Sequence, residues 1–336
     1  MRYSLAKIAD ELGLSKATIS MVLNGKAQQG RIGKEVEERV LEFCRKVNYV
    51  PNIHAQLINK KYVNTFGFLV NQGVLADSDN PFSDLNITSI LGGIVLAAEK
   101  IDYRISIQLY NNEMNEEKVF EWLRNREIDG LIYYGLNIPE KWREIFSNEK
   151  RSVVGIGIEP DKDISSVNID NFTMSANITK HLIENGRKKF MYISGIDGSF
   201  VSDERKRGCI SALNESGIGI LPQNIISAKY SEKEAQNLIL KLKPNVDAIV
   251  CANDDMAIGV IKALKKLNIN IPKEIAVVGG DNICTSGYVS PSLTTYENNQ
   301  HQLGMEAVNV IHSMINGGSV KAVTLPSDLI IRESSN

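Results

Sequence analysis

The sequence predicts an N-terminal all-α helix-turn-helix domain joined to a larger α/β core of two lobes, each built on a doubly wound parallel sheet. Short amphipathic helices fill residues 4–48, and beyond residue 63 apolar strands alternate with helices in two successive series. This alternation is typical of parallel sheets covered by helices. A chain of 336 residues is also long enough for more than one domain.

Residues 4–25 contain two short helices joined at a glycine. Apolar residues recur at helical spacing in the first helix: Leu5, Ile8, Ala9 and Leu12. Gly13 tolerates a positive φ and can end this helix, and Ser15 is a suitable N-cap for the next one.

The second helix has an apolar side that carries Ile19, Val22 and Leu23. Its opposite side carries small, polar or flexible residues: Lys16, Ala17, Ser20, Met21 and Asn24. A helix that docks through one side and presents such residues on the other can enter the DNA major groove. Taken alone, the pattern also fits a helical hairpin with a solvated face.

A third helix is predicted from Lys34 to about Asn48, and Pro51 stops it because proline disfavours helix in the residue before it. Three helices in fewer than fifty residues form a minimal helix-turn-helix domain. The motifs TISxVLNG at 18–25, RIGKEVEERV at 31–40 and YVPN at 49–52 resemble the lactose/galactose repressor (LacI/GalR) family in order and spacing. The resemblance extends over the rest of the chain.

Charge is distributed unevenly along the chain. Residues 1–62 hold 11 Lys and Arg against 6 Asp and Glu, whereas the remainder holds 27 against 34. A basic head on an acidic body suits a contact with phosphates that is confined to one end. No apolar run reaches the ~18 residues of a membrane span, and the N-terminus lacks the apolar core of a signal peptide. With four scattered cysteines and no CxxC pair, we expect a reduced, cytoplasmic setting.

The core shows two series of short apolar runs suited to buried parallel strands. The expected strands are 66–70, 104–109, 129–134 and 152–158 in the first series, and 190–194, 224–228, 247–251 and 275–279 in the second. The expected helices are 89–100, 116–125 and 141–147, then 205–214, 231–242 and 254–267. Ligands of such sheets bind at the carboxyl ends of the strands, so two facing lobes create a cleft.

Signals for an enzyme or a metal site are poor. The sequence contains no GxxxxGK[ST] phosphate loop, no GxGxxG that opens a helix and no HExxH motif. The adjacent acids Asp254 and Asp255 follow a strand, where acids more often begin a helix than catalyse. We therefore expect no catalytic residues, no metal and no cofactor.

The resemblance implies a periplasmic-binding-protein-like core in which the chain crosses between the lobes three times. The expected domains are a helix-turn-helix domain at 1–48, a hinge at 49–62 and a core at 63–336. The first lobe would take about 63–185 and 297–325, and the second about 186–296 and 326–336.

The resemblance also places the second helix in the major groove. The residues it assigns to DNA contact are Ser4, Lys16, Ala17, Thr18, Ser20, Met21, Asn24, Tyr49, Asn52, Ala55 and Ile58. Many family members have arginine where Met21 stands, so this chain lacks a bidentate guanine reader and its preferred bases stay open. Ser4 and Tyr49 would touch phosphates, or act as a helix cap and a packing aromatic.

The hinge segment 52–61 is too short to be a stable isolated helix, and we expect it to fold only on DNA. Family relatives push an apolar side chain from this segment between base pairs. Ile58 aligns with that wedge, and Leu57 is the alternative. Two hinges side by side require a homodimer, whose symmetry predicts a palindromic operator on double-stranded DNA.

Several side chains of the core match the family's ligand shell: Arg205, Tyr230, Asn253, Asp254 and Asp281. In the first lobe either Asn86 or Ile87 would face the ligand, and counting back from Gly93 we select Ile87. The pair Asp170 and Asn171 matches a family motif, and its direct contact with ligand is left open. Arginine, asparagine and aspartate around an aromatic suit a sugar, and a purine-type ligand is also compatible with the family.

We therefore predict a cytoplasmic, dimeric, sequence-specific transcriptional regulator, a repressor rather than an activator, whose operator affinity is controlled by a small molecule between the lobes. Two other classes fit parts of the sequence. A sugar-binding transport protein would use the same lobes, and an enzyme could be built on the two-lobed scaffold.

Overall fold

A computed structural model describes residues 3–49, 62–74, 80–111, 117–148 and 151–336. The chain separates into two compact units, Met1–Val63 and Asn64–Asn336. Each unit is described by itself. In the residues that the structure describes, no helix is long and apolar enough to cross a lipid bilayer.

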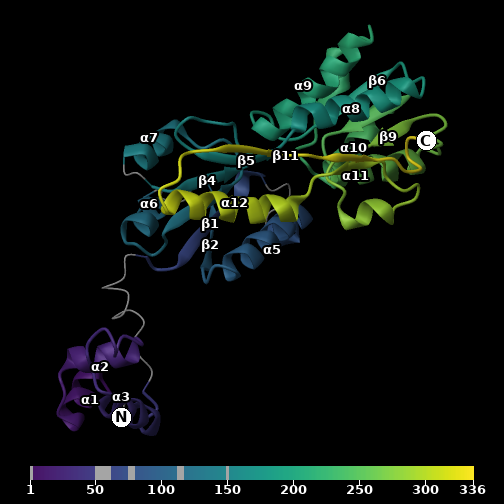
Figure 1. The fold of residues 1–336 in the computed structure, drawn as a ribbon. Helices are drawn as coiled ribbons and strands as arrows, with labels where there is room; N and C mark the ends of the chain where they lie inside the picture. The colour runs from purple at the N-terminus through teal and green to yellow at the C-terminus, as the bar shows by residue number, and fades with distance from the viewer. Residues whose placement is uncertain (1–2, 50–61, 75–79, 112–116, 149–150) are drawn as a thin grey trace. The chain divides into compact units, whose positions relative to one another are not determined.

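The N-terminal unit is the predicted three-helix domain (Figure 1). Its helices are α1 (Leu5–Leu12), α2 (Lys16–Leu23) and α3 (Lys34–Lys46). Gly13 ends α1 in the left-handed conformation at φ 62°, as the sequence predicts. Ser15 caps α2 by accepting a hydrogen bond from the backbone N–H of Thr18 at 3.0 Å. Local sequence therefore sets the turn between the first two helices.

A small apolar core holds the three helices together. Ile8 and Ala9 of α1, Ile19 and Val22 of α2 and Val40 of α3 are all buried in it. The remaining buried members are Ala27 and Cys44. The side of α2 that the sequence assigns to packing is the side that packs.

The first lobe of the core contains a six-stranded parallel sheet, in the order β11-β5-β4-β3-β1-β2. Its strands are β1 (Thr65–Asn71), β2 (Arg104–Tyr110), β3 (Gly130–Tyr134), β4 (Val153–Ile156), β5 (Ser165–Ile169) and β11 (Ala322–Leu325). Its helices are α5 (Leu85–Glu99), α6 (Glu117–Arg124), α7 (Glu140–Asn148) and α12 (Gln300–Ile315). One core packs α5 and α12 against the sheet, and a second core packs α6 and α7. The sequence predicts a buried strand at β2, but β2 is an edge strand in which only Tyr110 is buried and the other residues are half-buried or exposed.

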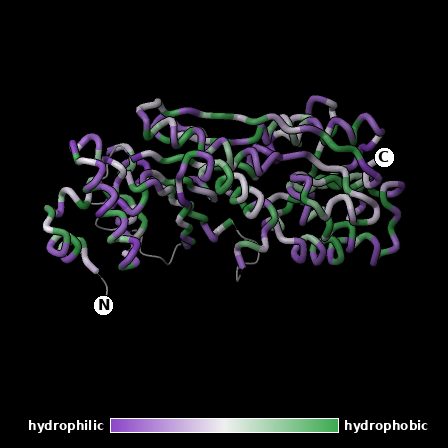
Figure 2. Tube along the Cα trace, turned by 60° about the horizontal axis from the view of Figure 1, so that its bottom comes forward, coloured by the Kyte–Doolittle hydropathy of each residue, from purple (hydrophilic) through white to green (hydrophobic). Residues whose placement is uncertain are grey.

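The second lobe contains a four-stranded parallel sheet in the order β7-β6-β8-β9. Its strands are β6 (Phe190–Ser194), β7 (Ile225–Ser227), β8 (Ala248–Cys251) and β9 (Ala276–Val278). Its helices are α8 (Asn171–Glu184), α9 (Phe200–Glu215), α10 (Glu232–Leu242) and α11 (Asp254–Lys266). Two short antiparallel strands, β10 (Thr295–Glu297) and β12 (Asp328–Ile330), complete the core. Hydrophobic segments run through the interior of each lobe (Figure 2).

The first crossing between the lobes lies earlier than expected. The sequence analysis assigns residues up to about 185 to the first lobe, but Met174, Ile178 and Leu182 of α8 are buried in the second lobe's core. Helix α8 also packs along α9. The chain therefore crosses at Asp170, directly after β5, because the apolar face of α8 matches the second sheet. It returns between β10 and α12, and crosses again between β11 and β12.

Two glycines bring α5 and α12 together. A Cβ at Gly93 would lie 1.9 Å from the backbone oxygen of His301, and a Cβ at Gly304 would lie 2.1 Å from that of Ile90. Only glycine permits this approach of two helix backbones. The contact holds the N-terminal ends of both helices side by side at the cleft, where Asn86 and Gln300 meet.

Candidate functional site

The predicted DNA-facing side of α2 is free at the surface of its unit. Lys16, Ala17, Met21 and Asn24 are exposed, while Thr18 and Ser20 are half-buried. Met21 is a large apolar side chain with 42% of its surface exposed. An exposed apolar side chain beside a lysine and an asparagine can make both methyl contacts and hydrogen bonds to base edges.

Three predicted DNA-contact residues also have local structural roles. Ser4 caps α1 by accepting a hydrogen bond from Lys7 N–H at 3.2 Å. Asn24 donates its amide to the backbone oxygen of Ser20 at 2.8 Å, which keeps that side chain folded along the helix. Tyr49 packs against the apolar core of the unit. The cap and packing interpretations of Ser4 and Tyr49 are thus confirmed, and their contact with DNA stays a prediction.

The predicted hinge contacts fall outside the described residues. These are Asn52, Ala55 and Ile58, together with the alternative wedge Leu57.

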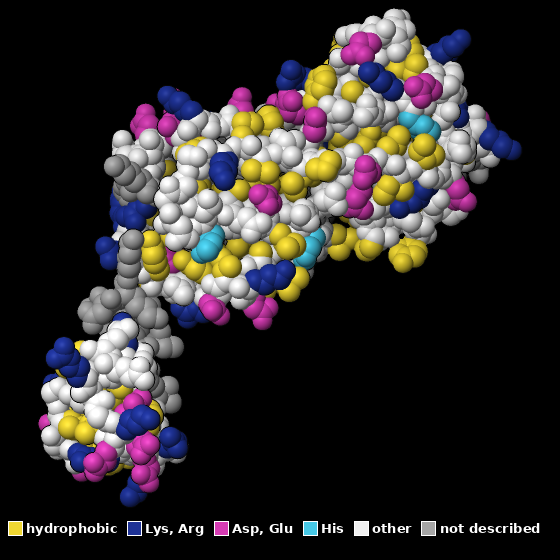
Figure 3. All heavy atoms as spheres, viewed as in Figure 1, with side chains coloured by type: hydrophobic (Ala, Val, Ile, Leu, Met, Phe, Trp, Pro, Cys, Tyr) yellow, Lys and Arg dark blue, Asp and Glu magenta, His cyan; other side chains and the backbone are white. Residues whose placement is uncertain are grey.

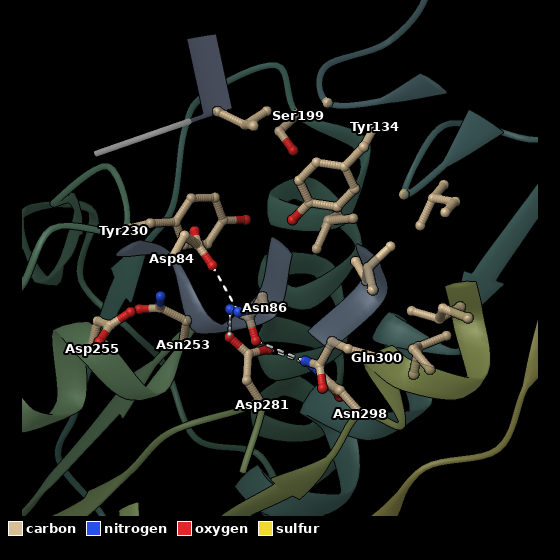
Figure 4. Close-up of a pocket in the computed structure, with 18 of the residues that line it drawn as sticks. Asp84, Asn86, Tyr134, Ser199, Tyr230, Asn253, Asp255, Asp281, Asn298 and Gln300 are labelled. Carbon is tan, nitrogen blue, oxygen red and sulfur yellow. Dashed lines mark hydrogen bonds between the residues drawn. The ribbon is translucent and has the colours of Figure 1, made fainter. Parts of the chain in front are cut away.

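A cavity of about 460 Å³ lies between the two lobes of the core. This volume is typical of small-molecule sites. The first lobe and the crossing contribute mainly Asn80, Asp84, Asn86, Tyr134, Asn168, Asn298 and Gln300. The second lobe contributes mainly Asn171, Ser199, Arg205, Tyr230, Asn253, Asp255 and Asp281. Figure 4 shows labelled polar side chains from both lobes pointing inward, among them Asn86, Tyr230 and Asp281.

Arg205 is the buried centre of this arrangement. Its Nη2 forms an ion pair with Asp281 at 3.0 Å, and both side chains are 6% exposed. Its Nε donates to Asn171 Oδ1 at 2.8 Å, and its Nη1 donates to the backbone oxygen of Ala252. A buried charge needs such partners because desolvation of an isolated ion is costly. All three nitrogens of the guanidinium therefore have protein partners.

Asp281 links the lobes. Its second carboxylate oxygen accepts from Asn86 Nδ2 of α5 at 3.1 Å, and Asn298 donates to its first oxygen. Gln300 of α12 donates to Asn86 Oδ1 at 2.9 Å (Figure 4). These bonds join side chains from both lobes, so any ligand that displaces Asn86 or Asp281 changes the contact between the lobes.

The prediction of Asp254 as a cavity residue is wrong, and its neighbour Asp255 takes that place. Asp254 is fully buried, and its carboxylate accepts hydrogen bonds from Thr295 Oγ1 and from the backbone N–H of Ile283. It therefore fixes the start of α11 against two neighbouring loops. Asn253 does line the cavity, and its Oδ1 caps α11 by accepting from Met256 N–H at 3.0 Å.

The selection of Ile87 is also wrong. Ile87 is fully buried in the apolar core of the first lobe, whereas the alternative Asn86 lines the cavity. The polar residue faces the cleft and the apolar residue faces the sheet, because consecutive residues of a helix point in different directions. Asn171, whose role the sequence left open, lines the cavity and bonds Arg205. Asp170 caps α8 by accepting from Thr173 N–H at 2.9 Å.

Sequence reasoning missed many of the polar cavity residues, among them Asp84, Tyr134, Asn168, Asn298 and Gln300. Asp84 accepts from the backbone N–H groups of Asn86 and Ile87, so it is the N-cap of α5. An aspartate two residues before the expected ligand contact is a signal that could have identified it.

Burial raises the pKa of the carboxyl groups in the cavity wall and of Asp254 directly behind it. Desolvation and the nearby charge of Asp281 raise the pKa of Asp255 to about 7. The same two causes raise the pKa of Asp254 to about 8. Desolvation raises the pKa of Asp281, and Arg205 opposes that rise. The cavity therefore holds acidic groups whose charge is costly unless a donor approaches them.

In the part of the chain that the structure describes, no three His, Cys, Asp or Glu side chains gather in a way that could hold a metal ion.

Comparisons with known proteins match both units. Residues 4–52 match the family described as bacterial regulatory proteins, lacI family, and residues 179–335 match a periplasmic binding protein-like domain. The transcriptional regulator MalR of Clostridium butyricum is 29% identical over 98% of both chains.

Two solved structures share the fold over almost the whole chain. The lac repressor dimer bound to operator and an anti-inducer aligns with TM-score 0.86 and 20% identity, covering 100% of this chain and 99% of that one. A complex of the transcriptional regulator CelR with cellobiose aligns with TM-score 0.74 and 22% identity, covering 99% of this chain and 100% of that one.

Proposed function

The chain belongs to the LacI family of bacterial regulatory proteins, and we propose that it is a transcriptional repressor whose affinity for a palindromic operator changes when a sugar binds in the cavity of its core. The observation that carries this proposal is the presence, in one chain, of an exposed face on α2 and a cavity lined by polar side chains between two lobes.

The DNA-binding part rests on the exposed face of α2. Lys16 can donate to guanine or to a phosphate, and Ala17 and Met21 can contact thymine methyl groups. The Ser15 cap orients the helix N-terminus, whose backbone N–H groups also favour phosphate. In this proposal the hinge at 49–62 folds in the minor groove and inserts Ile58, or Leu57, between base pairs.

The effector part rests on the hydrogen-bonding groups of the cavity. Carboxylate and amide side chains can bind hydroxyl groups, and Tyr230 and Tyr134 offer aromatic surface beside them. One structural neighbour was solved with cellobiose, and one relative is named MalR. These observations favour a sugar over a purine-type ligand, although shape alone admits either.

Communication between effector and operator rests on the bonds that cross the cavity. The bond from Asn86 to Asp281 joins the lobes. A ligand that binds one arrangement of the lobes better than another shifts the balance between them, and operator binding is linked to that balance.

We propose a homodimer, because the core exposes apolar surface that a second copy can cover. Val95 and Leu96 of α5 are 45% and 48% exposed, and Ile107 of the neighbouring strand β2 is also exposed. Figure 3 shows exposed hydrophobic side chains over the first lobe. The lac repressor was solved as a dimer on its operator. Two copies would also provide the symmetry that a palindromic site requires.

The family consists of transcription regulators, and we propose that this chain acts in the cytoplasm, without catalysis and without a cofactor. The two other classes predict different observations. A transport protein would be found outside the cell, and an enzyme would turn over the sugar that it binds.

The test uses the full-length protein and fragments of its own genome. We expect a sequence-specific complex whose affinity falls steeply with salt, because phosphate contacts release counterions. Calorimetry against a sugar panel should identify a ligand, and that ligand should change the operator dissociation constant. The proposal fails if no salt-sensitive, sequence-specific complex forms.

A further inference from the structure

We propose that the cavity selects sugars without an anionic group, so that a phosphorylated sugar binds more weakly than its unphosphorylated parent. This inference rests on the proposed function, because it names the chemical class of the effector. It follows from the charges, the helix ends and the hydrogen-bond acceptors of the cavity.

The inner wall of the cavity has more acidic than free basic groups. Asp84, Asp255 and Asp281 line it, and Arg205 is the buried cation among them. Each nitrogen of its guanidinium already donates to a protein acceptor on Asp281, Asn171 or Ala252, and its charge is paired with the carboxylate of Asp281. The charge of Asp281 already disfavours a negative charge at Asp255, and an anionic ligand group beside these carboxyls would meet the same repulsion.

A second cation, Lys233, is exposed at the edge of the cavity. A solvated lysine ammonium offers little attraction, because water and salt screen it. The neighbouring Glu232 forms an ion pair with Lys262 at 2.7 Å. The charged side chains at the edge of the cavity therefore do not offset the acidic side chains of its inner wall.

Two of the helix N-termini that face the cavity, those of α5 and α11, are occupied by the protein's own acceptors, whereas α9 begins at Ser199 without a side-chain cap. Such ends are ready-made phosphate sites when their N–H groups are free. Asp84 accepts the first N–H groups of α5, and Asn253 accepts from the N–H of Met256 at the start of α11. Asp255 adds a carboxylate to the first turn of α11. A phosphate would have to displace these groups.

Buried acceptors in the wall remain without donors. Asn168 is 4% exposed and Asn298 is 2% exposed, and the Oδ1 atom of each has no hydrogen-bond partner among the described residues. The carboxyl group of Asp255 is half-buried, and no donor among the described residues contributes a hydrogen bond to it. A ligand hydroxyl can donate a hydrogen bond to the carboxyl group of Asp255, whereas an ionised phosphate has only acceptors to offer. The cavity is thus matched to a ligand rich in hydroxyl donors.

Calorimetry of the full-length protein with matched pairs tests this inference. The probes are glucose, maltose and cellobiose, each compared with its 6-phosphate ester. We expect at least one parent sugar to bind, and its ester to bind at least tenfold more weakly. An ester that binds as tightly as its parent, or more tightly, overturns the inference while leaving the regulator function intact. If no parent or ester binds although the operator complex forms, both this inference and the sugar part of the proposed function fail.

Two variants distinguish charge from shape. Asp255→Asn and Asp84→Asn keep the size of the side chain, and asparagine remains a good N-cap at position 84. Each substitution should lower, severalfold, the ratio of the ester's dissociation constant to that of the parent sugar, because it removes an acidic group. Asp163→Asn is the matched control, since Asp163 is exposed and lies outside the cavity. If this ratio is the same in the wild type and in all three variants, charge repulsion is not the reason that the ester binds more weakly.

Discussion

The face of α2 and the cavity of the core both carry polar and charged side chains, but these side chains are exposed on α2 and buried in the cavity. Lys16 and Met21 of α2 are exposed at the surface of their unit. Arg205 and Asp281 of the cavity are buried and bonded to each other. Side chains on the α2 face are therefore available for a partner, whereas those in the cavity already support the fold. The difference predicts that substitutions in the first region change binding alone, and substitutions in the second change binding and stability together.

The largest loss of stability is expected for Arg205→Ala. The substitution leaves Asp281 buried without its counter-ion, which should destabilise the core by about 3–5 kcal/mol and abolish the response to effector. Chemical unfolding of the full-length protein measures the loss. Arg207→Ala on the same helix is the control, because the exposed pair of Arg207 with Glu204 should contribute less than about 1 kcal/mol. Equal losses in the two variants would contradict the central role of Arg205.

The buried acids predict that the core is more stable at low pH within the range from about 4 to 8. Burial raises the pKa of Asp254 from 3.8 to about 8, so the folded protein keeps a proton that the unfolded chain releases. Stability from this group is therefore present at the acidic end of the range and is lost as pH rises toward 8. The urea concentration at the midpoint of unfolding, measured at several pH values between 5 and 8, gives the slope of stability against pH.

Asp254→Asn should flatten that slope, because the amide is neutral at every pH and still offers an oxygen to Ile283 N–H. The exposed substitution Asp163→Asn should leave the slope as it is. If Asp254→Asn has the wild-type slope, the pH dependence originates elsewhere.

On the α2 face, Lys16→Ala should weaken operator binding and leave the unfolding midpoint unchanged. A contact to guanine would cost about 1–3 kcal/mol and relax specificity at one base, whereas a phosphate contact would lower the salt slope by about one. Lys46→Ala, an exposed lysine of α3, is the charge-matched control. A clear loss of stability in Lys16→Ala would break the distinction between the two regions.

The smallest effect is expected for Asn86→Ala. This variant removes the bonds to Asp281 and Gln300, of which each contributes about 1 kcal/mol. We expect a severalfold change in effector affinity, measured by calorimetry, and a larger radius of gyration of the ligand-free protein. Asn309→Ala, at an exposed position of α12, is the control. Identical scattering curves for wild type and Asn86→Ala would show that this bond does not hold the lobes together.

The sequence alone determined much of the architecture. Caps at Ser15 and Gly13, helical spacing of apolar residues and short apolar strands are local features that form as predicted, although the edge strand β2 is less buried than its sequence suggests. The exposed face of α2 was also predictable, because one amphipathic helix defines its own outer side. Arg205, Tyr230, Asn253 and Asp281 were identified from a family resemblance, and all of them line the cavity.

Only the tertiary structure decided which neighbour of each pair faces the cavity and where the chain crosses between the lobes. Asp255 replaces Asp254 and Asn86 replaces Ile87, because a step of one residue turns a helix by about 100° and the packing of that helix selects the side that faces the ligand. Asn86 lies 195 residues from Asp281 and 214 residues from Gln300 in sequence, and it meets them through helix contacts and the interlobe crossing. Local sequence fixes the residues that a helix carries, but the direction in which it presents them depends on surfaces contributed by distant parts of the chain.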